Sequence, residues 1–403
     1  MRIALVVPHL FMHQEILPDV IFSPGWLAID LACELARSGH QVTIFSPGPI
    51  KKFFKNSEVD NVTADLSLFE AELEQRGYGY IELLKKHPLT YITLARQVQS
   101  EIVAQAYEVA NQDKFDLVHI WCNEEELALV NARFCQKPVV FNHHEPFNFL
   151  TRYRAIFPKY KHLNWVSFSH AQRVTLANDV NWVSNVYHGL PEHKYHLEEQ
   201  KQNYLLYMGR IIRPKGVHYA IELAKKTGLK LKIAGKHYAD HSKDKYWQEF
   251  IKPEIDDEQI EYVGFVKKTE EKQKLVGKAR ALLIPSTWQE PFGMVMIEAL
   301  ACGTPVIGFD QGSIPEIVKD GETGFVVEYQ REEKIEKNGH SVAKDFQKLK
   351  QDRFFLENLQ KLKQTLEKIK EIDAAKCRQV FDKRFTTKQV VQNYESLYQD
   401  LIQ

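Results

Sequence analysis

Two glutamates, Glu290 and Glu298, are the residues whose type and spacing most suggest chemistry. They lie in the segment PSTWQEPFGMVMIEALACGTPVIG, in which a polar loop follows an apolar strand and a helix is predicted to begin near Pro291. A proline suits the first helical position because its missing N–H would have no partner there. The exposed amides and the dipole of such a helix start favour an anion. The amides concerned are those of Phe292, Gly293, Met294 and Val295.

The spacing of the two glutamates suits a carbohydrate ligand. At ~1.5 Å per helical residue their backbones would be roughly 12 Å apart, about the length of a diphosphate with a sugar at one end and a ribose at the other. A carboxylate can also accept two hydrogen bonds from vicinal hydroxyls. The alternative is that Glu290 caps the helix and Glu298 is a solvated side chain.

Two cations, Arg210 and Lys215, follow a predicted strand in the segment YMGRIIRPKG. In open α/β sheets, ligands bind at the carboxyl ends of the strands. A guanidinium can bind two phosphate oxygens at once, and a lysine adds a point charge. The segment therefore predicts a phosphate site, and the alternative is an ordinary basic loop.

A histidine and a glycine complete the candidate set. His144 lies in VVFNHHEP, at the end of a predicted strand and beside a carboxylate, where it can donate to a sugar hydroxyl or shuttle a proton. The chemistry does not separate it from the adjacent His143, and the alternative is a structural histidine. Gly25 is predicted to lie in a turn after the first strand, ahead of a helix that includes Trp26.

Several motifs of other enzyme classes are missing from the sequence. It has no GxxxxGK[ST] phosphate loop, no GxGxxG after the first strand, no HExxH and no GxSxG. It also has no Asp-x-Asp, the carboxylate pair that would hold a metal on a diphosphate. These absences argue against a P-loop ATPase, a dinucleotide enzyme of the usual type and a zinc peptidase.

Composition places the chain among soluble globular proteins of more than one domain. It has 403 residues, with 53 Lys+Arg against 53 Asp+Glu and 44% hydrophobic residues. This balance gives no overall attraction to nucleic acid. The five cysteines form no CxxC pair, so a disulfide framework or a zinc site is not expected. We interpret the apolar start MRIALVVPHLF as a first strand rather than a signal peptide, which favours the cytoplasm.

The elements that must position these residues follow the same alternation of strands and helices in both halves of the chain. Apolar strands alternate with amphipathic helices, a pattern typical of a parallel sheet covered by helices. We therefore expect an α/β fold of two tandem Rossmann-like domains, with a cleft between them that could hold all the candidate residues. The expected boundaries are 1–190 and 191–385, with 386–403 as an amphipathic helix that returns to the first domain. Residues 48–90 are expected to be loops with one helix near 66–76, and 329–372 to be a charged helical excursion.

With these segments in register, the sequence resembles the family 4 glycosyltransferases, which share the two-domain GT-B architecture. The pattern Glu-x7-Glu of Glu290 and Glu298 is the most specific part of the resemblance. The segments GRIIRPKG, PVVFNHHEP, VYHGLP and DQGSIPEIVKDGETGFVV are also similar to the family. The family's usual Gly-Gly in the first loop is Pro24-Gly25 in this chain.

The resemblance implies a retaining transfer of a hexosyl-type group from a nucleotide-diphosphate sugar to a hydroxyl, without an essential metal or other cofactor. It implies that Arg210 and Lys215 neutralise the departing diphosphate, aided by the amides of residues 292–295. Glu290 would hold the donor sugar and Glu298 the nucleotide ribose. His144 would contact the sugar from the first domain, the acceptor side, and Gly25 would let the first loop approach the phosphates.

Donor, acceptor and reaction keep alternatives at this point. A UDP-sugar is the first expectation and GDP-mannose the second, and the acceptor is an unassigned carbohydrate, lipid-linked or small molecule. A nucleotide-sugar epimerase or a phosphorylase on the same fold, or a non-catalytic sugar-nucleotide-binding subunit, are the rival interpretations. Basic and aromatic residues in Lys51–Lys55 and Arg152–Lys161 could contact a membrane surface, at the inner face of the membrane, although ordinary solvated surface also explains them.

Overall fold

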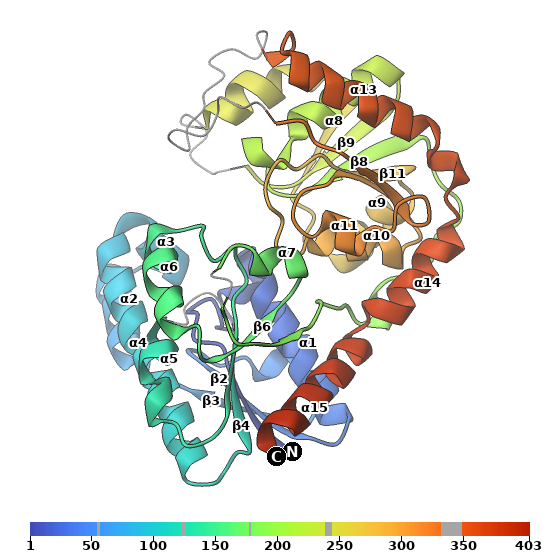
Figure 1. The fold of residues 1–403 in the computed structure, drawn as a ribbon. Helices are drawn as coiled ribbons and strands as arrows, with labels where there is room; N and C mark the ends of the chain where they lie inside the picture. The colour runs from blue at the N-terminus through green and yellow to red at the C-terminus, as the bar shows by residue number, and fades with distance from the viewer. Residues whose placement is uncertain (55–56, 122–125, 177–178, 238–243, 332–348) are drawn as a thin grey trace. The chain divides into compact units, whose positions relative to one another are not determined.

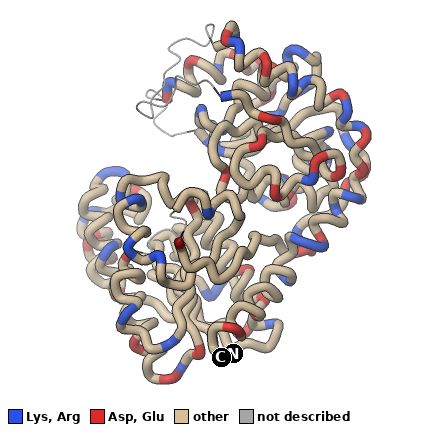
Figure 2. The backbone as a smooth tube through the Cα atoms, viewed as in Figure 1, with Lys and Arg blue, Asp and Glu red and all other residues tan. Residues whose placement is uncertain are grey.

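A computed structural model describes residues 1–54, 57–121, 126–176, 179–237, 244–331 and 349–403 (Figure 1). The chain divides into two compact units. The first comprises Met1–Gly189 and Thr387–Gln403, and the second comprises Leu190–Thr386. Lysines, arginines and acidic residues are intermixed on both units, as the equal numbers of the two charges suggest (Figure 2).

The first unit is built on a seven-stranded sheet in the order β3-β2-β1-β4-β5-β6-β7, in which every pair is parallel. The strands are β1 Arg2–Val6, β2 Gln41–Ser46, β3 Val59–Thr63, β4 Leu117–Trp121, β5 Val139–Asn142, β6 Asn164–Ser167 and β7 Trp182–Asn185. Both faces of the sheet are covered by helices, so the central strands can be apolar on both sides. The helices are α1 Ser23–Arg37, α2 Ser67–Arg76, α3 Tyr80–Lys86, α4 Pro88–Asn111, α5 Glu126–Asn131, α6 Thr151–Ile156, α7 His170–Arg173 and α15 Thr387–Ile402.

The second unit is built on a six-stranded parallel sheet in the order β10-β9-β8-β11-β12-β13. The strands are β8 Tyr204–Met208, β9 Lys230–Ala234, β10 Ile260–Gly264, β11 Ala281–Ile284, β12 Val306–Phe309 and β13 Gly324–Val327. The helices are α8 Val217–Thr227, α9 Thr269–Gly277, α10 Met294–Ala301, α11 Ile314–Ile317, α13 Arg353–Glu367 and α14 Ala374–Arg384. The two parallel sheets with their helices confirm the predicted α/β fold class of tandem Rossmann-like domains.

Residues 48–90 hold more structure than the sequence predicts. Besides the expected helix, now α2, they contain strand β3 and helix α3. β3 is an edge strand with the polar sequence VDNVT, so it lacks the apolar run that marks a buried strand. Its Asn61 donates to the backbone oxygen of Ile44 at 3.1 Å and accepts from the amide of Ile50 at 2.9 Å. These tertiary hydrogen bonds, which a local pattern cannot reveal, hold the strand in place.

The charged excursion predicted for 329–372 is described only in part, because 332–348 lie outside the described residues. Helix α13 follows them, capped at its start by the Asp352 side chain, which accepts from the amide of Phe355 at 3.0 Å. Its Phe355, Leu359, Leu362 and Leu366 are buried in the core of the second unit. Between β9 and β10, a π-helical turn at Trp247–Ile251 is followed by a 3₁₀ turn at Lys252–Glu254.

The last helix, α15, packs against α1 (Figure 1). It also closes a buried polar network in the first unit. Tyr398 Oη lies 2.6 Å from His119 Nδ1, and Tyr394 Oη donates to Asn142 Oδ1 at 3.2 Å. His119 Nε2 contacts the same Asn142 oxygen, so Nε2 carries the proton and Nδ1 accepts from Tyr398. The prediction that the terminal helix returns to the first domain is thereby confirmed.

Acidification should destabilise the first unit through this network. Burial lowers the pKa of His119 from 6.5 to about 4. The unfolded chain binds the extra proton between these values, so the stability is present above pH 6.5 and is lost as the pH falls towards 4. For His119 alone the loss between pH 7 and pH 5 is about 2 kcal/mol. His9 and His188, whose pKa values burial also lowers, contribute in the same direction.

The contribution of His119 to the acid loss of stability can be isolated by comparing the pH dependence of the parent with that of His119→Gln. The variant should be less stable at pH 7 but should lose about 2 kcal/mol less on going to pH 5, measured by urea unfolding. The exposed His162 offers a matched control, and His162→Asn should keep the parental pH dependence. An equal acid loss in His119→Gln and the parent would contradict the assignment.

Candidate functional site

Three loops at the carboxyl edge of the second sheet pack directly on one another. The loop after β8 contacts the loop after β11, where the carbonyl of Pro214 accepts from the amides of Thr287 at 2.8 Å and Trp288 at 3.2 Å. The loop after β11 contacts the loop after β12, where the Glu290 carbonyl accepts from the Ser313 amide at 2.8 Å. The predicted phosphate segment and the predicted glutamate segment are therefore neighbours.

Two glycines permit this close packing. Gly216 has φ +73°, and a Cβ there would lie 1.8 Å from the carbonyl oxygen of Pro285. Gly312 has φ +62°, and a Cβ there would lie 2.3 Å from both backbone N and O of Glu290. Since no other residue tolerates both the left-handed backbone and the contact, these positions require glycine.

Lys215 and Glu290 form an ion pair across the first two loops. Their side chains are only 15% and 14% exposed, so water screens the pair less than it would at the surface. Arg210 on the same loop is exposed, and the described residues include no ion pair of its guanidinium. Its backbone is fixed by Tyr207, whose hydroxyl donates to the Arg210 carbonyl at 2.8 Å. The site thus offers one paired cation and one exposed cation.

Helix α10 begins later than the sequence predicts. Its first residue is Met294 and its N-cap is Gly293 with φ +82°, so Pro291 lies in the loop and not at the first helical position. The left-handed backbone of Gly293 cannot continue a helix. Glu290 is therefore outside α10, and the helical spacing assumed between the two glutamates does not hold. A Cβ at Gly293 would lie 2.6 Å from Met296 Cε and 3.2 Å from Glu290 Cγ.

The start of α10 still presents three of the four predicted amides. Within the described residues, the backbone N–H groups of Gly293, Met294 and Val295 have no acceptor. The first N–H groups of any helix lack intrahelical partners. The next amide, that of Met296, donates to the Gly293 carbonyl at 3.0 Å. Phe292 is buried, and its carbonyl accepts from Ser313 Oγ at 2.7 Å.

Glu298 is buried, which rules out the alternative of a solvated side chain. It is 5% exposed, and its Oε1 accepts from the Tyr195 hydroxyl at 3.0 Å and from Lys272 Nζ at 2.8 Å. Its Oε2 is buried and has no hydrogen-bond partner among the described residues. Sequence analysis did not identify Tyr195 or Lys272. Tyr195 lies in the hydrophilic stretch after the domain boundary, and Lys272 is one of the two lysines on α9, so neither carries a local signal.

The structure separates the two adjacent histidines that chemistry left equivalent. His143 packs inside an aromatic core, with its ring centroid 4.9 Å from Phe147 and 4.7 Å from Tyr153. His144 stacks on His188, with centroids 5.2 Å apart and planes 8° apart. Burial, followed by the neighbouring histidines, lowers the pKa of His144 well below its usual value. His144 is therefore a neutral imidazole at the end of β5.

Gly25 occupies the first turn of α1 rather than the predicted turn before it. A Cβ at Gly25 would lie 2.7 Å from Met12 Sδ and 2.7 Å from the Phe22 ring. The preceding residue, Pro24, uses its carbonyl to accept from Trp121 Nε1 at 2.9 Å. The glycine is thus required by packing inside the first unit. The candidate residues are divided between the units, and a single cleft that joins them stays a prediction.

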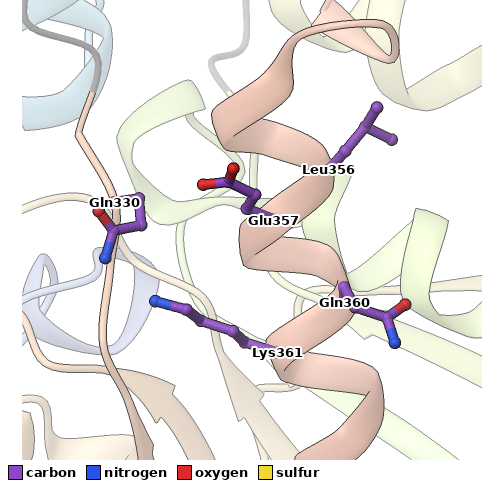
Figure 3. A pocket seen from close by; sticks show the side chains of 5 residues that line it. All are labelled: Gln330, Leu356, Glu357, Gln360 and Lys361. Carbon is purple, nitrogen blue, oxygen red and sulfur yellow. The ribbon is translucent and has the colours of Figure 1, made fainter.

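A pocket beside α13, among the described residues, contains none of the candidate residues. Its volume is about 620 Å³, and the side chains of Gln330, Glu357 and Lys361 face one another there (Figure 3). In the part of the chain that the structure describes, no cluster of histidine, cysteine or acidic residues could hold a metal ion. No described helix combines the length and hydropathy that a membrane span requires. Of the two segments considered for membrane contact, Lys51–Lys55 is described only in part, since Lys55 lies outside the described residues.

Comparison with known proteins adds two matching family models. The model described as "Glycosyl transferases group 1" matches residues 191–362, and the model described as "Glycosyltransferase Family 4" matches residues 25–179. Each match lies within one of the two units. The first of these matches contains all the candidate residues of the second unit.

Individual relatives agree with the family models. An uncharacterized glycosyltransferase of Methanocaldococcus jannaschii is 24% identical over 347 residues, covering 75% of this chain and 81% of that protein. The structure of HepE from Anabaena in complex with UDP-glucose matches with a TM-score of 0.64 at 15% identity, covering 100% of each chain. Sucrose-phosphate synthase from Thermosynechococcus elongatus matches with the same score and identity, covering 100% of this chain and 99% of that chain. At these identities the two structures show a common fold.

The contact between the loops after β8 and β11 can be tested at Gly216. Gly216 and Gly228 cap the two ends of α8, both with left-handed backbones, but a Cβ at Gly228 meets nothing within 4 Å. Gly228→Ala should therefore cost only the backbone strain, about 1 kcal/mol. Gly216→Ala adds the clash with Pro285 and should cost at least about 3 kcal/mol of unfolding free energy. Equal costs in urea unfolding would show that the loops do not pack as described.

Proposed function

We propose a donor site for this chain. The chain belongs to the group 1, family 4 glycosyltransferases, which have the GT-B fold. These are retaining enzymes that transfer a sugar from a nucleotide sugar. In this proposal the chain moves a hexosyl-type group from a nucleotide-diphosphate sugar to a hydroxyl, without an essential metal. The donor lies along the carboxyl edge of the second sheet, and the first unit contributes the acceptor side.

The observation that carries the donor site is the unpartnered oxygen of Glu298. A buried carboxylate oxygen without a hydrogen bond costs free energy, typically ~1–3 kcal/mol or more. Glu298 Oε2 is such an oxygen, while Oε1 is already occupied by Tyr195 and Lys272. A vicinal diol would supply the missing donors. This supports the assignment of Glu298 to the ribose of the nucleotide.

The diphosphate is assigned to the cations of the loop after β8 and to the start of α10. During transfer, the bond between the anomeric carbon and the phosphate oxygen breaks, and negative charge develops on the leaving diphosphate. Fixed cations and amides that face this charge stabilise the transition state more than the ground state. Lys215, Arg210 and the amides of Gly293, Met294 and Val295 are the groups available for this role.

Glu290 is assigned to hydroxyls of the donor sugar. In the absence of ligand its carboxylate is held by Lys215. Binding of a donor would let Lys215 turn to phosphate and Glu290 to hydroxyls, so each partner exchanges one polar contact for another. Gly293, at the start of α10, lies directly beside Glu290: a Cβ there would be 3.2 Å from Glu290 Cγ, so the missing side chain leaves room next to the carboxylate.

His144 is assigned to the sugar from the side of the first unit. Because burial keeps the imidazole neutral, one ring nitrogen can donate to a hydroxyl while the other accepts. A cation is not available from this residue near neutral pH. The role is therefore orientation of the sugar, and Gly25, inside α1, is proposed to allow close approach of the first unit's helix start to the donor phosphates.

A UDP-sugar is the first donor to test and GDP-mannose the second. The Anabaena protein of similar fold was crystallised with UDP-glucose, which supports this order. The acceptor is an unassigned carbohydrate, lipid-linked or small molecule. An epimerase or a phosphorylase of the same fold would release no nucleoside diphosphate in response to a hydroxyl acceptor, which separates these reactions from transfer.

A thermal-shift screen tests the donor class. A ligand that binds only the folded protein raises its melting temperature, by an amount that grows with its concentration relative to Kd. UDP, GDP and their sugar conjugates should raise it, with the uracil series first, while free hexoses and inorganic phosphate should not. A protein that responds to none of these nucleotides would contradict the proposed donor site.

Removal of either central group should remove most transfer without unfolding the chain. Lys215→Ala should lower nucleotide release in the presence of acceptor by about 100-fold or more, the loss typical of a transition-state electrostatic contact. Glu298→Ala should also remove most transfer, because the donor loses the group that holds its ribose. Lys226→Ala, an exposed lysine on α8, is the matched control and should retain parental turnover. Near-parental turnover in both test variants, measured over a panel of hydroxyl acceptors, would show that the donor site is wrongly assigned.

A further inference from the structure

Two residues outside the recognised motifs converge on one oxygen of Glu298. The Tyr195 hydroxyl and Lys272 Nζ both donate to Oε1, at 3.0 and 2.8 Å. We propose that Tyr195 and Lys272 are positioning residues that fix the Glu298 carboxylate with Oε2 towards the ligand, and so make the donor site selective for ribonucleotides over 2′-deoxyribonucleotides. This inference rests on the proposed assignment of Glu298 to the ribose.

Tyr195 is itself held by a third element. Arg378 of α14 donates from Nη1 to the Tyr195 carbonyl at 2.7 Å and to the Ala301 carbonyl at 3.1 Å. The guanidinium thus ties the backbone of Tyr195 to the last residue of α10, the helix that carries Glu298. Tyr195 is also buried, at 3% exposure, so its ring has little freedom to turn. Its hydroxyl is therefore a fixed donor.

Lys272 supplies the charge that a buried carboxylate requires. It lies on α9, which packs against α10, and its side chain is 27% exposed while that of Glu298 is 7% exposed. An ionised carboxylate buried without a cation is strongly unfavourable. Because Lys272 and Tyr195 both use Oε1, the acceptor capacity of Oε2 remains for a ligand. Among the described residues, only Tyr195 and Lys272 donate to Oε1, so the carboxylate could rotate if both donors were removed.

This geometry predicts a distinct selectivity. A ribonucleotide offers both hydroxyls of its vicinal diol to Oε2, whereas a 2′-deoxynucleotide keeps only the 3′-hydroxyl, so the buried oxygen loses one of its two donors. Sites built to hydrogen-bond a hydroxyl discriminate against analogues that lack it for this reason. Selectivity is therefore a readout of the carboxylate's orientation, which a general loss of folding would not mimic.

The test compares the binding of UDP with 2′-deoxy-UDP, and of GDP with 2′-deoxy-GDP, by isothermal titration calorimetry on the full chain. The parent should bind the ribonucleotide of its preferred base about 10- to 100-fold more tightly than the deoxy form. Lys272→Met should lose most of this ratio by weakening ribonucleotide binding, while deoxynucleotide affinity stays within about twofold. Tyr195→Phe should lower the ratio about three- to fivefold, as expected for one neutral hydrogen bond.

Two further variants make the result specific. Lys272→Arg keeps a cation and should retain the parental ratio. Lys274→Met changes an exposed lysine of the same helix and should also retain it. Melting temperatures confirm that each variant is folded.

The failure of this inference differs from failure of the proposed function. If Glu298→Gln keeps the parental ratio, or if no ribonucleotide binds the parent, the ribose assignment is wrong and the inference falls with it. If Glu298→Gln loses the ratio but Lys272→Met and Tyr195→Phe keep it, the positioning role alone is wrong. Equal weakening of both nucleotide forms in these two variants would likewise overturn the positioning role.

Discussion

The backbone contact between the loops after β8 and β11 is the constraint on which the second unit's site depends. Parallel strands deliver their loops to one edge of a sheet, but only close contact of those loops brings side chains within bonding distance. Gly216 against Pro285 allows that contact, and Gly312 against Glu290 allows the adjoining contact of the loops after β11 and β12, since a side chain at either glycine would force the loops apart. The pairing of Lys215 with Glu290 follows from it. The chemistry of the site is thus set first by two positions that carry no functional group.

Each carboxylate of the site is matched by a cation from a different element. Glu290 is paired with Lys215 from the loop after β8, and Glu298 with Lys272 from α9. The two pairs differ in the hydrogen-bonding capacity that they leave for a ligand. Glu290 meets a lysine that is itself a candidate ligand group, so in the proposed donor site this pair would exchange partners on binding. The Glu298 pair is supported by Tyr195 and leaves one oxygen unsatisfied, so it can bind without rearrangement. In the proposed donor site, a preorganised carboxylate for the ribose beside an exchangeable pair for the phosphates would suit a ligand that must be held at one end while its bond breaks.

The sequence predicts what local patterns encode. The apolar runs of β8 and β11 are buried on both faces, and their strand assignments, the α/β class and the terminal helix follow from periodicity. The start of α10 does not, because proline at 291 satisfies the local rule while the left-handed Gly293 overrides it. β3 is missed because an edge strand needs no apolar run. Tyr195 and Lys272 are missed because only tertiary structure brings them to Glu298, far from either in the sequence.

In the first unit, the candidate residue His144 is positioned by packing in a buried cluster rather than by charge. Asn142 ends β5 two residues before His144, and its side chain accepts from Tyr394 and donates to the Val166 carbonyl at 3.1 Å. The strand end that carries His144 is thereby fixed by α15, which comes from the other end of the chain. Trp121 packs on His144 and on Tyr394, with centroids 4.9 and 6.1 Å away, and continues the same cluster. Because these groups are buried and His144 is neutral, the histidine's placement depends on packing by the terminal helix and needs no counter-ion. The return of that helix to the first sheet therefore fixes the candidate histidine as well as the fold.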